Sequence, residues 1–278
     1  MELDCPKLDI FVPDNMPLQS ALDRTTHMGI GAHADDLEIL AFHGIGLCHD
    51  DPRHWFSGVV ISDGAGSPRD GRYRDFSAAE MMAQRQQEQR DAAALGGYSL
   101  QLQLGYSSAA VRSEPRKTLV PDLVAILQQC QPQVLYLHNL ADAHATHRAA
   151  ANACIDALRE LEPAALPAEI YGVEVWRSLD WLPEQYRSCL PIEDEQGLQA
   201  QLLRCHDSQI GGGKRYDEAI IARQRANATL TESQQVDTLA ACALAMNLRP
   251  LIDQPSLSTD AFLQECLGQF SEQLLAAD

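Results

Sequence analysis

His27-Met28-Gly29-Ile30-Gly31-Ala32 is a short apolar run that leads directly into His33-Ala34-Asp35-Asp36-Leu37-Glu38. The first segment predicts a buried strand, and the pattern that follows it predicts a helix. An imidazole, two adjacent carboxylates and a third carboxylate nearby are crowded together where the strand should end. Like charges destabilise one another at such a position, and a bound metal ion would relieve that repulsion. This loop is therefore the first candidate for a functional site.

Other apolar runs alternate with helical patterns along the chain. We expect strands at 27–32, 56–62, 99–104, 134–138 and 169–176, and helices at about 36–49, 76–95, 116–130 and 145–161. This alternation predicts βαβ units and hence an α/β fold with a Rossmann-like, mainly parallel sheet flanked by helices. After residue 195 the pattern turns mostly helical, at about 196–208, 214–229, 235–246 and 259–276.

These segments suggest a single domain over residues 1–278. We expect an irregular leader at 1–25, an α/β core at 26–190 and a helical C-terminal extension at 191–278. A chain of 278 residues that is 45% hydrophobic can bury a substantial core of this kind.

Composition limits the classes of partner. The formal net charge of −18 comes from 21 Lys and Arg against 39 Asp and Glu, and it would repel nucleic-acid phosphates and anionic lipid. No apolar run approaches the ~20 residues that span a bilayer, and the first residues show no secretory signal. The eight cysteines form no C-x-x-C pair, which argues against a thiolate zinc cluster or a disulfide scaffold. We expect a cytoplasmic protein without nucleic-acid or membrane partners, and leave open whether it forms a homo-oligomer.

A second polar cluster follows the strand expected at 134–138. It reads His138-Asn139-Leu140-Ala141-Asp142-Ala143-His144-Ala145-Thr146-His147-Arg148. Open α/β sheets bind ligands outside the carboxyl ends of their strands, and both clusters lie at such ends. Catalytic zinc commonly takes three protein ligands and leaves a fourth position for water. His33 and Asp36 together with one histidine of the second cluster could supply three, which would leave Asp35 and the other histidine for proton transfer and charge stabilisation.

Each cluster alone also has a plainer explanation. Paired aspartates at a helix start often only cap the helix, and an isolated H-x-x-H is commonly a helix surface. The combination of the two clusters, each at a strand end, is what favours a metal site.

These residues resemble the PIG-L (LmbE-like) family of metal-dependent de-N-acetylases. The first cluster is similar to the family's A-H-P-D-D-x-E signature, and Asp142-Ala143-His144-Ala145-Thr146-His147-Arg148 is similar to its second motif. Ser62-Asp63-Gly64, Arg85-Gln86-Gln87-Glu88 and His206-Asp207-Ser208-Gln209 resemble further elements. In order and spacing the resemblance extends over roughly residues 27–210.

The resemblance implies a zinc-dependent hydrolase that removes an N-acyl group, most often acetyl, from a small amino sugar or glycoconjugate. His33, Asp36 and His147 would hold the metal, with another divalent ion such as iron as the alternative to zinc. Asp35 would be the general base that activates water. His144 would stabilise the oxyanion and protonate the leaving amine.

Further residues acquire supporting roles from the same resemblance. Asp142 would orient His144, as carboxylates commonly orient working histidines. Arg85 would bind a substrate hydroxyl or phosphate with support from Glu88, although an i, i+3 pair can also be a surface ion pair. His206 would contact substrate, with packing among the C-terminal helices as the alternative.

Two positions depart from the family pattern. Ala34 replaces a proline, which should soften the loop, and Thr146 replaces an aspartate, which should alter tuning of the site without loss of the metal.

A non-catalytic sugar- or metabolite-binding protein on the same fold is the main alternative to the hydrolase. A nucleotide-binding Rossmann protein is less favoured, because the glycines after the first strand lack the third glycine of G-x-G-x-x-G.

Overall fold

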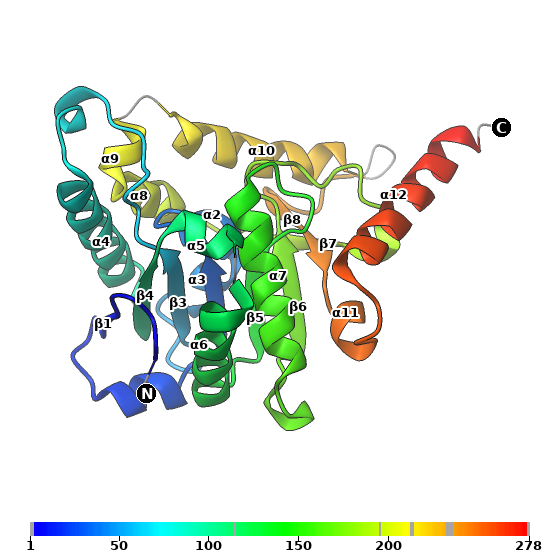
Figure 1. Ribbon diagram of the computed structural model, residues 1–278. Helices are drawn as coiled ribbons and strands as arrows, with labels where there is room; N and C mark the ends of the chain where they lie inside the picture. Colours follow the sequence, from blue (N-terminus) through cyan, green and yellow to red (C-terminus); the bar gives the residue numbers. More distant parts are fainter. Residues whose placement is uncertain (1–2, 114, 195, 212–213, 232–235, 277–278) are drawn as a thin grey trace.

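The structure is a computed structural model that describes residues 3–113, 115–194, 196–211, 214–231 and 236–276. Its centre is an eight-stranded sheet in the order β1-β4-β3-β2-β5-β6-β8-β7 (Figure 1). The strands are β1 (Asp9–Phe11), β2 (His27–Gly31), β3 (Phe56–Ser62), β4 (Leu100–Tyr106), β5 (Val134–His138), β6 (Glu169–Val173), β7 (Arg187–Pro191) and β8 (Cys242–Asn247). Neighbouring strands from β4 through β3, β2 and β5 to β6 pair in parallel, whereas β1 and β8 pair antiparallel to their neighbours. The expected Rossmann-like, mainly parallel sheet is confirmed.

Helices cover both faces of the sheet. They are α1 (Leu18–Asp23), α2 (Leu37–Leu40), α3 (Phe42–Cys48), α4 (Ala78–Leu95), α5 (Ser108–Ser113), α6 (Pro115–Cys130), α7 (Ala145–Arg159), α8 (Leu198–Arg204), α9 (Asp207–Ile210), α10 (Tyr216–Leu230), α11 (Pro250–Asp253) and α12 (Thr259–Leu275). Figure 1 shows α6 and α7 in front of the sheet, α2 and α3 behind it, and α10 across its upper end. Two apolar clusters fill the layers, one around Leu123 and Ile155 and the other around Leu37 and Phe42. Within the described ranges, no helix is both long and apolar enough to span a bilayer.

The strand order changes direction at β2. From β2 the chain runs through β3 to β4 on one side of the sheet, and it then returns to place β5 on the other side of β2. β2 and β5 pair in parallel from His27 opposite Val134 to Gly29 opposite Tyr136. In open α/β sheets, the crevice at such a reversal is the usual ligand site. Both polar clusters follow these two strands and therefore meet at this crevice.

The C-terminal part contributes more to the sheet than the sequence pattern predicts. The helix expected at about 235–246 is wrong over its described residues, because 236–241 are not helical and Cys242–Asn247 form β8, between β6 and β7. Cys242-Ala243-Leu244-Ala245-Met246 is fully buried, and periodicity cannot separate a short buried strand from a buried helix. The described part of residues 191–278 is mostly helical, yet it also adds β8 to the sheet. The expected irregular leader likewise contains β1 and α1.

Candidate active site

The loop after β2 is shaped by close approach of its own residues. A Cβ atom at Gly31 would lie 2.9 Å from Cβ of Asp36, so only glycine leaves room for the aspartate to fold back. The Asp36 carboxylate accepts a hydrogen bond of 2.7 Å from the amide of His33. Asp35 has a φ of +90°, a conformation that costs a non-glycine residue on the order of 1 kcal/mol. Its amide donates to Oε1 of Gln89 on α4 at 3.2 Å, which helps to hold this conformation.

Three side chains from the two clusters bring possible metal ligands together. His33 Nδ1 lies 3.2 Å from Oδ2 of Asp36 and 3.1 Å from Nε2 of His147. His147 Nε2 lies 3.4 Å from the other Asp36 oxygen. Ligand atoms at bond lengths of about 2.0–2.1 Å from a tetrahedral zinc ion are roughly 3.3 Å apart. The spacing and chemistry of this donor set therefore fit a small divalent cation.

Two overlapping groups of candidate ligands share His147. One contains His33, His144 and His147, and the other contains Asp36, His138 and His147, with the ligand atoms of each group within 4.8 Å of one another. His138 stacks on His147 at a centroid distance of 3.8 Å. Its Nε2 accepts a hydrogen bond of 2.9 Å from the amide of Ala32, which occupies the lone pair that a metal would need, and lies 3.1 Å from Oδ2 of Asp36. His138 is therefore a buried neighbour of the donor set behind the cavity lining, and sequence reasoning gave it no role.

The electrostatics of the donor set also favour a cation. Burial opposes ionisation of Asp36, but His147 and His138 hold its pKa well below the usual value. Burial likewise opposes protonation of His33, yet the hydrogen bond and charge of Asp36 raise the pKa of His33. Burial lowers the pKa of His147, which keeps its imidazole neutral and its lone pair available. An ionised carboxylate beside imidazoles is the combination that binds zinc or iron.

Asp142 contacts a different histidine from the one expected. Its Oδ1 lies 3.3 Å from Nδ1 of His147, while His144 donates to this carboxylate only through its backbone amide at 2.8 Å. The predicted orientation of the His144 ring by Asp142 is therefore corrected: Asp142 orients His147, the expected ligand. The contact directs the other ring nitrogen of His147 toward His33 and Asp36, and outer carboxylates fix ligating histidines in this way.

A cavity of about 440 Å³ opens beside the donor set. Its walls include six of the predicted site residues, namely His33, Asp35, Asp36, Arg85, His144 and His147. Burial, together with the neighbouring His147, lowers the pKa of the exposed His144. A larger cavity of about 800 Å³, next to Glu193, contains none of these side chains. Size alone therefore does not mark the site, whereas the chemistry of the lining does.

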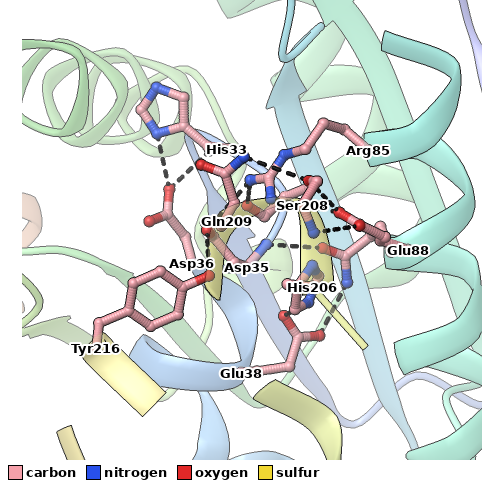
Figure 2. Close-up of polar contacts among 12 residues, drawn as sticks. His33, Asp35, Asp36, Glu38, Arg85, Glu88, His206, Ser208, Gln209 and Tyr216 are labelled. Carbon is pink, nitrogen blue, oxygen red and sulfur yellow. Dashed lines mark hydrogen bonds and ion pairs between the residues drawn. The ribbon is translucent and has the colours of Figure 1, made fainter. Parts of the chain in front are cut away.

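Two polar side chains contact the Asp35 carboxylate (Figure 2). Tyr216, at the start of α10, donates a hydrogen bond of 2.8 Å to Asp35 Oδ2. Arg85 lies 3.2 Å from the same oxygen and also donates to the carbonyl of Ala34. Burial opposes the charge on Arg85, but Asp35, Tyr216 and Glu88 raise its pKa. Arg85 thus contacts the expected base directly; its predicted contact with substrate remains a prediction.

Glu88 and His206 lie behind the cavity wall. Glu88 accepts hydrogen bonds of 2.7 Å from both the amide and the hydroxyl of Ser208, and is 3.6 Å from Arg85. His206 is fully buried, with its Nε2 3.0 Å from Oε2 of Glu38 (Figure 2). The substrate contact expected for His206 is therefore corrected, because its ring packs inside the protein and does not line the cavity. Glu88 supports Arg85 and Ser208 from within and is likewise outside the lining.

Several residues of the site escaped sequence reasoning. Tyr216 and Gln89 show no local motif, because each meets the site only through the tertiary fold. Glu38 belongs to the first cluster, but the sequence does not indicate which residues contact it. It accepts hydrogen bonds from Gln89 at 2.9 Å and Tyr98 at 2.8 Å.

Comparison with known families supports the resemblance. Residues 28–158 match the family described as PIG-L, GlcNAc-PI de-N-acetylase. Residues 28–158 form a PIG-L domain. It contains β2 through α7, and with them all the candidate metal ligands and the expected base. Comparison with curated protein sequences gave no match.

Solved structures share the fold around this PIG-L domain. The N,N'-diacetylchitobiose deacetylase from Pyrococcus horikoshii has a TM-score of 0.61 and 18% identity, over 84% of this chain and 88% of that one. The 4-carboxy-2-hydroxymuconate hydratase GalB from Pseudomonas putida has a TM-score of 0.59 and 18% identity, over 80% and 95%. The A40926 pseudoaglycone deacetylase Dbv21 has a TM-score of 0.57 and 15% identity, over 81% and 97%. Since deacetylases and a hydratase share the fold, the reaction must be argued from the site.

Proposed function

We propose that this protein is a metal-dependent hydrolase that removes an N-acyl group, most often acetyl, from a small molecule containing an amino sugar. The observation that carries the proposal is the joint placement of a three-atom donor set and Asp35 at one cavity. His33, Asp36 and His147 would hold a divalent cation, zinc or iron. When bound, such an ion supplies Lewis acidity, which polarises a carbonyl and lowers the pKa of water.

Asp35 is the general base in this proposal. Its carboxylate lines the cavity next to the ligand Asp36, and Arg85 and Tyr216 both contact its Oδ2. These two contacts leave Oδ1 to accept a proton from water as it attacks the amide carbon.

His144 acts on the other side of the reacting amide. Its ring is exposed to the cavity, 5.0 Å from the His33 ring and 4.6 Å from the His147 ring between centroids. A positioned imidazolium there can donate a hydrogen bond to the developing oxyanion and then pass its proton to the departing amine, while the proton that Asp35 took from water replaces it. An amine is a poor leaving group without that proton. Asp35 therefore serves the attack of water, and His144 serves the departure of the amine.

The alternative is a protein that binds a sugar without turning it over. Purified protein would be analysed for metal, stripped with a chelator, reloaded with zinc or iron, and incubated with a panel of N-acetylglucosamine compounds while acetate is measured. We expect one tightly held ion, acetate release by the loaded protein, and loss of both in His33→Ala. Tight sugar binding by metal-free protein, with no acetate from any compound under any loading, would overturn the proposal in favour of the alternative.

A further inference from the structure

Positive side chains line the cavity of an otherwise strongly acidic chain. The net charge is −18, yet the lining includes Arg85, Arg112 and Lys214. The charge of Arg85 is matched by Asp35 and Glu88. Within the part of the chain that the structure describes, neither Arg112 nor Lys214 forms an ion pair with a carboxylate. The cavity therefore holds two cations whose charge the described residues do not neutralise.

Arg112 is fixed next to the donor set by a neutral partner. It lies on α5, and its Nη1 donates a hydrogen bond of 2.9 Å to Oγ1 of Thr146. Thr146 is buried and directly precedes His147. A hydroxyl orients the guanidinium but carries no charge, so the positive charge of Arg112 stays available to a ligand. A guanidinium binds carboxylate and phosphate oxygens in a fixed planar geometry.

Lys214 is placed over an aromatic face on the same cavity. Its Nζ lies 5.3 Å from the centroid of the Trp176 ring. Trp176 is 44% exposed, although large apolar side chains are usually more buried. Its backbone amide donates at 3.1 Å to Oδ2 of Asp142, the carboxylate that also contacts His147. The backbone of Trp176 is thus linked through Asp142 to the candidate ligand His147. The Lys214 ammonium lies over the Trp176 ring.

We propose that Arg112, Lys214 and Trp176 form a subsite for an anionic amino sugar, one that carries a carboxylate or a phosphate monoester. The sugar ring packs on Trp176, and its anionic group contacts Lys214 and Arg112. This inference rests on the proposed function for the placement of the acyl group at Asp35. The remaining acidic surface repels a large polyanion, so the preferred ligand is a small molecule with a single charged group.

Binding to the full-length, zinc-loaded Asp35→Asn protein tests the inference without turnover. The probes for isothermal titration calorimetry are neutral N-acetylglucosamine, its 6-phosphate, and N-acetylmuramic acid, which carries a carboxylate. We expect at least one anionic probe to bind about tenfold more tightly than the neutral sugar, with the gap narrowing at high salt. Comparison of the two anionic probes tells phosphate from carboxylate.

Substitution of each subsite residue tests which side chain produces the preference for an anionic sugar. Arg112→Gln keeps a donor for Thr146 without the charge, and Lys214→Met keeps the length of the side chain; each should weaken the anionic probe about fivefold and the neutral sugar less than twofold. Trp176→Ala should weaken all three probes. Arg204→Gln removes a positive charge from α8, outside the cavity lining, and should change nothing.

The outcomes separate this inference from the proposed function. Equal binding of neutral and anionic probes, or an equal effect of Arg204→Gln and Lys214→Met, would overturn the subsite. If wild-type protein releases acetate from neutral and anionic sugars at the same kcat/KM, the hydrolase stands and the subsite fails. If anionic probes bind selectively and no N-acyl sugar is hydrolysed, the subsite stands and the hydrolase fails.

Discussion

The phenol of Tyr216 donates a hydrogen bond of 2.8 Å to Oδ2 of Asp35, across 181 positions of sequence. Burial and the charge of Asp35 raise the pKa of Tyr216, so the phenol stays protonated and remains a donor. The contact joins the start of α10 to the strained loop after β2. The hydrogen bond engages Oδ2 of Asp35 and leaves Oδ1 to accept a proton from water. The C-terminal helices therefore complete a site whose candidate ligands lie between His33 and His147 in the sequence.

Tyr216→Phe tests whether this hydrogen bond works through Asp35. Loss of a hydrogen bond to a charged group should lower kcat about tenfold and change KM little. In a double-mutant cycle, the same substitution in the Asp35→Asn background should have almost no further effect, because its target is gone. Independent, additive losses from the two substitutions would show that Tyr216 acts elsewhere.

Asp142→Asn tests the corrected role of Asp142. A carboxylate that fixes the ring of a metal-ligating histidine typically contributes ten- to a hundredfold to metal affinity. We therefore expect zinc affinity, measured by competition with a chromogenic chelator, to fall about tenfold or more. Asp122→Asn is the matched control, since Asp122 is a buried carboxylate that accepts from Tyr106 and lies outside the cavity lining. An unchanged zinc affinity in Asp142→Asn would contradict the Asp142–His147 assignment.

His206→Ala distinguishes a structural from a substrate-binding histidine. Removal of the ring takes one of three side-chain partners from the buried Glu38 carboxylate, and the loss of a hydrogen bond to a charged group costs about 1.5–3 kcal/mol. The free energy of unfolding in urea should fall by about this amount, while KM of the folded enzyme stays within twofold. A raised KM with unchanged unfolding free energy would instead restore the substrate contact.

His43 gives the fold a defined dependence on pH. Burial, together with His27, lowers the pKa of His43 to about 4, and its Nδ1 donates to the Pro191 carbonyl at 3.0 Å. The unfolded chain takes up this proton near pH 6.5, whereas the folded chain does so only near pH 4. Stability is therefore full above about pH 6.5 and falls as the pH decreases toward 4.

The size of this effect is modest because the ring is only half-buried. The shift corresponds to at most about 3 kcal/mol, and we expect a loss of about 1–2 kcal/mol at pH near 5. Urea unfolding of wild-type protein and His43→Asn, whose amide can still donate to Pro191, should diverge by this amount between pH ~7 and ~5. Parallel pH profiles would rule out the contribution of His43.

Much of the fold could be predicted because its central strands are continuous apolar runs. The run at 56–62 coincides with β3, and the two polar clusters follow β2 and β5 as expected. β8 was missed because its alanine-rich run suits a buried helix equally well. The meeting of the two clusters was predictable because His33 follows β2 closely and His147 lies in the first turn of the helix that follows β5. The site was not predictable where a partner arrives from far along the chain, as Tyr216 does, or where a motif residue turns inward, as His206 does.

Hydrolysis by a metal ion and Asp35 is best tested by acetate release from wild-type protein and Asp35→Asn, each stripped with a chelator and then reloaded with zinc. We expect stripped wild-type protein to release no acetate from an N-acetylated amino sugar and reloading to restore release. Asp35→Asn should take up zinc equally well yet remain slower by about a hundredfold or more, the usual contribution of a general base. Acetate release that survives stripping, or that persists at the wild-type rate in Asp35→Asn, would contradict the roles of the metal ion and of Asp35.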